Sequence, residues 1–119
     1  MNKEKEILEK TNIRTGECIE GGIFEHTKFV NCTFNGVFKA FFCDIEGCIF
    51  NGVSVKLNNC LIDNCMFVKK DYNTNFKAKF SHFTRNAGES NFSFDLEYCR
   101  LEDLNFTFQK MKSNNCKID

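Results

Sequence analysis

Cysteines are the residues in this sequence best suited to chemistry. The chain of 119 residues contains eight of them, and the pairs Cys43/Cys48 and Cys60/Cys65 each enclose four residues. Structural zinc sites use paired knuckles with two to four intervening residues, so a metal centre is one interpretation. The same spacing recurs along the chain as a period of five, which explains it without a metal. We therefore expect the thiols to pack in the core, with no metal and no other cofactor.

The two histidines, His26 and His82, do not complete a catalytic set. A nucleophile, a histidine and an acid must lie within hydrogen-bond reach of one another, and the sequence has no G-x-S-x-G segment. The pair Gly21-Gly22 lacks the lysine and the helix of a phosphate-binding loop. The sequence therefore predicts a protein without enzymatic activity, with both histidines on its surface.

Charge is uneven along the chain. Residues 69–85 carry a local excess of positive charge, and residues 89–103 carry an excess of negative charge. Two solvated faces are the ordinary interpretation, and a bipolar surface that recognises a partner is the alternative. We predict a partner-binding site in the basic segment. Its residues are Lys69, Lys70, Lys77, Lys79 and Arg85.

Overall composition limits the classes of partner and location. Lys plus Arg and Asp plus Glu are 16 each, so the net charge is zero and gives no general attraction to nucleic acid. The first ten residues contain no apolar run typical of a signal peptide, and no later segment could span a bilayer. We expect a cytoplasmic protein without a membrane partner. Its cysteines would then stay reduced rather than form the disulfide scaffold of a secreted chain.

Apolar residues recur every five residues, with short breaks. The apolar centres are Ile19, Phe24, Phe29, Phe34, Ala40, Ile45, Phe50, Leu57, Ile62, Phe67, Tyr72, Leu96, Leu101, Phe106 and Met111. A period of five fits neither the 3.6-residue turn of a helix nor the two-residue alternation of a strand. It predicts a chain that bends at regular intervals, points each centre inward and stacks its coils.

The five-residue units resemble the repeat of the pentapeptide-repeat family. That repeat has a small residue, then Asp or Asn, then Leu or Phe, then two variable residues. The best matches are CDIEG at Cys43, CIFNG at Cys48, CLIDN at Cys60 and CRLED at Cys99. Large, polar or charged residues replace the small one at Glu17, Phe38, Lys70, Phe94, Leu104 and Gln109. The resemblance implies an all-β, right-handed quadrilateral β-helix with about 20 residues per coil and about four to five coils.

Two segments depart from the repeat. Residues 1–16 are charged and predict a short N-terminal helix or tail before the β-helix of residues 17–119. Residues 73–89 predict an irregular interruption, in which Phe76, Phe80 and Phe83 have the spacing of a short amphipathic helix. One interpretation is an irregular coil whose phenylalanines stay in the core. The other is a protruding loop or helix that binds a partner.

A repeat of this kind favours a rigid, non-enzymatic module that binds and modulates another protein. The resemblance also implies an alternative, because some members of the family mimic DNA and inhibit or protect DNA-processing enzymes such as DNA gyrase. This chain departs from those members in being short and neutral, and a mimic needs one continuous negative face. The family further implies a homodimer, here through the C-terminal coil near residues 111–118.

Overall fold

The computed structural model describes residues 12–51, 54–68, 75–88, 92–105 and 108–119, and within these ranges it contains strands and no helix. The strands are β1 (Asn12–Thr15), β2 (Cys18–Glu25), β3 (Thr27–Val30), β4 (Thr33–Phe41), β5 (Asp44–Glu46), β6 (Ile49–Asn51), β7 (Ser54–Asn58), β8 (Leu61–Asp63), β9 (Met66–Val68), β10 (Asn75–Lys79), β11 (His82–Thr84), β12 (Ala87–Gly88), β13 (Phe92–Glu97), β14 (Arg100–Glu102), β15 (Phe108–Asn114) and β16 (Lys117–Ile118). The all-β solenoid of stacked parallel coils that the sequence predicts is confirmed.

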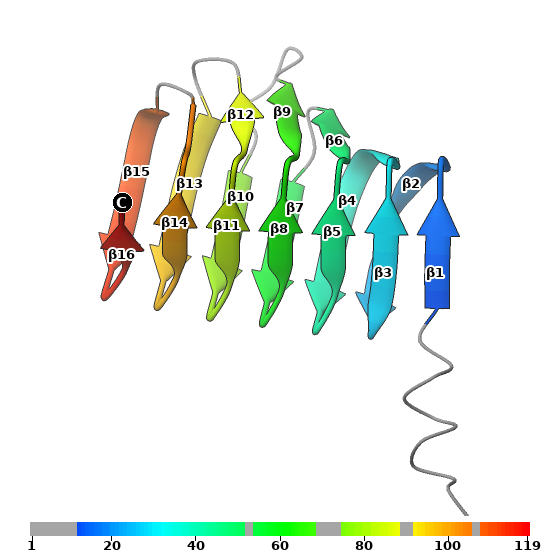
Figure 1. Cartoon of the computed structure of the whole chain (residues 1–119), viewed down its shortest axis with the longest axis horizontal. Coiled ribbons are helices and arrows are strands. Elements are labelled where there is room, and N and C mark those ends of the chain that lie inside the picture. The colour runs from blue at the N-terminus through cyan, green and yellow to red at the C-terminus, as the bar shows by residue number, and fades with distance from the viewer. Residues whose placement is uncertain (1–11, 52–53, 69–74, 89–91, 106–107) are drawn as a thin grey trace, which may run out of the picture.

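The strands form two layers of parallel ladders. One sheet has seven strands in the order β1-β3-β5-β8-β11-β14-β16, and a second sheet of nine strands holds the others. Figure 1 shows the seven-stranded sheet as one layer; of the second sheet, β4, β7, β10 and β13 lie behind it, and β6, β9 and β12 lie above its upper edge. Strand β1 lies at one end of the solenoid and β16 at the other. Each coil therefore buries what its neighbour leaves exposed.

The register gives the length of each coil. In the seven-stranded sheet the step between partners grows from 15 residues (Arg14 to Phe29) to 21 residues (Ile62 to Phe83). Phe29 pairs with Ile45, and only two further inward centres, Phe34 and Ala40, lie between them. A coil thus has three repeat units, where the quadrilateral coil implied by the family resemblance would have four.

Two corners of each coil are made in the same way, by a residue with positive φ two places after a centre. At the corner before the seven-stranded sheet these are His26, Phe42, Asn59, Phe80, Tyr98 and Asn115. At the corner after it they are Gly16, Asn31, Gly47, Asn64, Arg85 and Asp103. Glycine and asparagine adopt this left-handed conformation most readily, which explains their frequency in the repeat.

The third corner takes up the variation in coil length. Gly36 and Val37 lie within β4 at this corner, and residues 52–53, 69–74 and 89–91 separate the strands that meet there in the next three coils. The added residues therefore leave both neighbouring ladders in register. The breaks in the five-residue period are changes at one corner and do not interrupt the core.

Two predicted boundaries need correction. Residues 1–11 lie outside the described part, but Asn12–Thr15 form β1 and pair with β3, so the repeat begins before residue 17. Residues 75–88 continue the ladders as β10, β11 and β12, each paired in parallel with the preceding coil. Within this range the chain forms neither an amphipathic helix nor an irregular coil.

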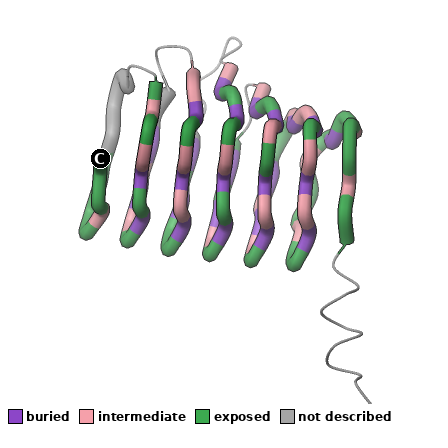
Figure 2. The backbone as a smooth tube through the Cα atoms, viewed as in Figure 1, coloured by how far each residue is buried: buried purple, intermediate pink, exposed green. Residues whose placement is uncertain are grey.

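Phenylalanine rings fill the core between the sheets, and buried residues alternate with less buried ones along the central strands (Figure 2). Phe34, Phe50 and Phe67 stack in successive coils, with ring centroids 4.9 and 5.0 Å apart. Phe38 and Phe76 lie beside small centres, Ala40 and Ala78, and all four are buried. The large residues that broke the repeat pattern therefore compensate for small neighbours, which keeps the core filled.

Six cysteines are buried, as the sequence predicts, and their thiols form hydrogen bonds with backbone carbonyl groups. The Sγ atoms of Cys43, Cys48 and Cys60 each contact the carbonyl oxygen two residues earlier, at 3.3–3.5 Å. The other buried cysteines are Cys32, Cys65 and Cys99. Hydrogen bonding with Cys43 and burial raise the pKa of the Cys60 thiol, which disfavours the reactive thiolate.

Native-state labelling should separate the cysteines by burial. We expect Cys18, which is exposed, to react with iodoacetamide at neutral pH, while Cys60 and Cys65 stay unmodified until the chain unfolds. Mass spectrometry of tryptic peptides before and after addition of urea measures this difference. Equal labelling of Cys18 and Cys60 in the folded protein would contradict the burial of the Cys60 thiol in the core.

Candidate interaction surfaces

The predicted binding residues do not form one cluster. Lys69 and Lys70 lie outside the described residues. Lys77 and Lys79 are both on β10 and point outward from the same sheet. Arg85 follows β11 at the corner after the seven-stranded sheet, where its Nε donates to Asp63 Oδ1 at 3.0 Å. The structure therefore separates Arg85 from the two described lysines.

Lys77 belongs to a row that sequence proximity does not reveal. The register places Lys39 opposite Lys56 and Lys56 opposite Lys77, in three successive coils. We call these three residues the lysine row. They are 17 and 21 residues apart in the sequence, but each immediately precedes an inward centre: Ala40, Leu57 or Ala78. That shared position was the signal that could have identified Lys39 and Lys56.

No ion pair links the lysine row to any residue that the structure describes. Nearby Lys79 is different, because its Nζ lies 3.3 Å from Glu97 Oε2. Adjacent strands are about 4.8 Å apart, so the row brings like charges close together, which is destabilising. A hollow of about 430 Å³ is lined in part by Lys56, Lys77 and Lys79 and by the acids Asp95 and Glu97. In the register Asp95 lies opposite Lys77 on the next strand, so its charge partly offsets that lysine. Lys39 and Lys56 each have a lysine opposite them on the next strand and offer ammonium groups to a ligand.

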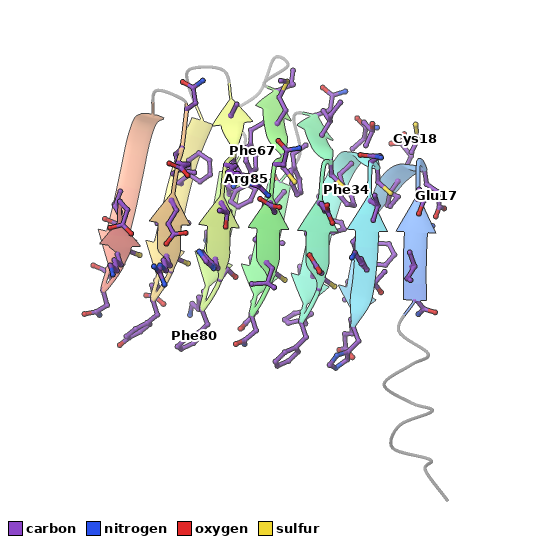
Figure 3. All side chains as sticks on the ribbon, in the orientation of Figure 1. Glu17, Cys18, Phe34, Phe67, Phe80 and Arg85 are labelled. Carbon is purple, nitrogen blue, oxygen red and sulfur yellow. The ribbon has the colours of Figure 1, made fainter. Side chains whose placement is uncertain are left out.

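Aromatic rings project from the corner next to this face. We call His26, Phe42, Asn59, Phe80, Tyr98 and Asn115 the corner ladder, since each backbone N–H of the first five bonds to the next coil. The His26 and Phe42 rings are stacked with centroids 5.3 Å apart, and Phe80 and Tyr98 are stacked at 5.1 Å. The labelled Phe80 projects from the lower edge of the solenoid in Figure 3.

These rings are unusual in their exposure. Phe42 is 56% exposed and Phe80 is 55% exposed, although large apolar side chains are mostly buried. Their positive φ is the conformation that this corner has in the neighbouring coils as well. The feature that singles them out is therefore the exposed ring and not the backbone.

The outer surface of the seven-stranded sheet carries acids that are paired with bases. Lys28 Nζ lies 3.9 Å from Glu46 Oε2, and Arg100 Nη2 lies 2.6 Å from Glu102 Oε1. Asp63 accepts the bond from Arg85 already described. The negative charges along this sheet are therefore partly neutralised in three of its coils.

The two histidines have different neighbours. His82 Nε2 is 3.3 Å from Glu102 Oε2, and His26 stacks on a phenylalanine. In the described ranges no group of three His, Cys, Asp or Glu side chains is arranged to hold a metal ion. Nor do those ranges include a helix long and apolar enough to cross a membrane.

The sequence matches no protein-family model, and no curated protein matches it.

Proposed function

We propose that this protein is a rigid, non-enzymatic interaction module that binds and modulates a partner protein through the lysine row. The observation that carries the proposal is the alignment of Lys39, Lys56 and Lys77 in consecutive coils, with a carboxylate, Asp95, opposite only the last of them. Clustered like charges cost the free protein stability, and an acidic partner would offset that cost. Complementary charge also steers association and selects among partners.

The ladders give the row a fixed geometry. Strands β4, β7 and β10 are joined by parallel pairing and lie over buried phenylalanines, so the lysine backbones cannot move apart without opening the core. A surface that is already ordered loses little entropy on binding. These properties favour recognition of a partner by a preformed surface.

DNA mimicry remains the alternative, and the described charges favour it less. A mimic needs a continuous negative face, but Glu46, Asp63 and Glu102 are each paired with a base. The opposite sheet carries the lysine row. A homodimer through the C-terminal coil also remains a prediction. It is supported by β16, which among the described strands pairs only with β14 and leaves Ile118 half exposed.

The test of this function is a charge-neutralised variant, Lys39→Gln/Lys56→Gln/Lys77→Gln. Because it removes repulsion between neighbouring strands, we expect its stability to equal or exceed that of the wild type. The wild type and the variant would each be used to capture proteins from cells of the native source. Any protein that only the wild type captures would be purified and titrated against both by calorimetry. We expect affinity to fall at least about tenfold for such a partner.

Lys28→Gln is the matched control, because this lysine lies on the other sheet and is paired with Glu46. It should capture the same partner as the wild type. If the triple variant captured every protein that the wild type and Lys28→Gln capture, with equal affinity, the lysine row would not be the binding surface.

A further inference from the structure

The corner ladder has one gap between its two stacked ring pairs. Asn59 occupies the position between Phe42 and Phe80, and its N–H bonds to the Lys79 carbonyl at 3.0 Å, so the backbone ladder is continuous there. The Asn59 amide donates to Asn58 Oδ1 at 2.6 Å and stays against its own coil. Two rings thus face each other across a position that has no ring.

The width of this gap suits one aromatic ring. Two strand spacings separate the Phe42 and Phe80 positions, about 9.6 Å. A ring midway would lie about 4.8 Å from each neighbour, within the range of offset-stacked aromatic pairs, about 4.5–7 Å. The two pairs already present have the same spacing, with centroids 5.3 and 5.1 Å apart. An inserted ring would complete a continuous stack of five.

Positive charge lies at a fixed distance from the gap. Lys56 in β7 is three residues before Asn59, and Lys77 in β10 is three residues before Phe80. Three residues of extended chain place each lysine about 10 Å from the corner position that follows it. Both lysines are exposed and have no ion pair with a described residue. An extended peptide with an aromatic residue and a carboxylate three positions away spans the same distance.

We propose that the gap between Phe42 and Phe80 receives an aromatic side chain from an acidic segment of the partner protein, whose carboxylates bind Lys56 and Lys77. This inference rests on the proposed function and specifies the chemistry of the partner. A single-stranded nucleic acid fits less well, because such strands stack successive bases on a platform. Here the Phe42–Phe80 gap has a ring on both sides, whereas the position after Tyr98 is Asn115, so one ring enters between two others.

A peptide with one tryptophan, two glycines and three aspartates, in that order, is the probe. The protein has no tryptophan, so selective excitation of indole reports the peptide alone. We expect a saturable shift of its emission to shorter wavelength, with a Kd of about 1 mM or tighter. A peptide with alanine in place of tryptophan, followed by calorimetry, should bind at least about tenfold more weakly.

Asn59→Phe is the decisive variant, because it fills the gap with the chain's own ring. We expect it to fold, since Phe42 and Phe80 adopt the same backbone conformation, and to lose at least about tenfold in peptide affinity. Asn64→Phe is the matched control. Asn64 is in the same coil, is exposed and has φ of 54°, against 56° for Asn59, but lies at the other corner. It should bind as the wild type does.

Three results would overturn this inference: no saturable binding of the peptide, equal affinity of Asn59→Phe and the wild type, or tighter binding of a deoxythymidine oligonucleotide than of the peptide at the same salt. These failures are distinct from failure of the proposed function. If a partner loses affinity for the triple lysine variant but binds Asn59→Phe as it binds the wild type, the aromatic gap is refuted and the lysine-row function stands. If Asn59→Phe abolishes peptide binding but no partner is sensitive to the lysine substitutions, the lysine-row function is refuted and the gap stands.

Discussion

Replacement of Phe50 by alanine is expected to lower the free energy of unfolding by about 3–5 kcal/mol. Phe50 is fully buried and stacks between Phe34 and Phe67, and it also meets Phe76 edge-on at 5.7 Å. Truncation leaves a cavity in the middle of the stack. Because each coil of a solenoid is stabilised by contact with its neighbours, the cavity weakens two interfaces at once.

Urea denaturation followed by circular dichroism measures this loss, with Phe80→Ala as the control. Phe80 is 55% exposed and stacks mainly on Tyr98, so its truncation should cost less than about 1.5 kcal/mol. The comparison keeps the chemical change constant and varies only burial. Two variants of equal stability would contradict the continuous phenylalanine core.

The five-residue period was sufficient to predict the core because it records how often the backbone turns. Ile45, Ile62 and Leu101 were expected to share an axis, and each is at most 1% exposed. Two of the centres, Tyr72 and Phe106, lie outside the described residues. The prediction that Met111 is a centre is wrong. Met111 pairs with Phe94, whereas Ser113 pairs with the centre Leu96 and so holds the position of the centre. A serine at a centre carries no hydrophobic signal, which hid the true register.

The segment predicted as an interruption was misread for a related reason. Its centre is Ala78, and the larger Phe76 and Phe80 lie two places before and after it. Phe76 points inward while Phe80 forms an exposed corner, so their helix-like spacing does not place them on one face. Hydrophobicity alone cannot distinguish an inward position from a corner when both hold phenylalanine.

The candidate surface was harder to predict than the core. A search along the sequence groups neighbours such as Lys77, Lys79 and Arg85, but the coil places adjacent residues on different faces. Surface rows join residues one coil apart, and coil length varies from 15 to 21 residues. Lys39 and Lys56 could be aligned with Lys77 only by counting from the inward centres rather than by a fixed step.

Replacement of the buried Asn86 by leucine should cost about 1–3 kcal/mol, because it leaves the buried Cys65 N–H without its partner. Asn86 is 1% exposed and stands where the preceding coil has Cys65. Its Oδ1 accepts from the Cys65 N–H at 2.9 Å, and its Nδ2 donates to the Ile62 carbonyl at 3.2 Å. Leucine has a similar volume but can make neither bond, so the loss reports hydrogen bonding rather than packing.

The repeat itself supplies the control, Asn86→Cys. Two coils earlier, Cys48 Sγ accepts the N–H of Cys32 at 3.3 Å, so a thiol at position 86 can serve Cys65 in the same way. We expect Asn86→Cys to cost less than about 1.5 kcal/mol and to keep the Cys65 amide protected from hydrogen exchange. In Asn86→Leu that amide should exchange faster. Equal stability and equal exchange in the two variants would mean that the side chain at position 86 stabilises the coil by its volume alone.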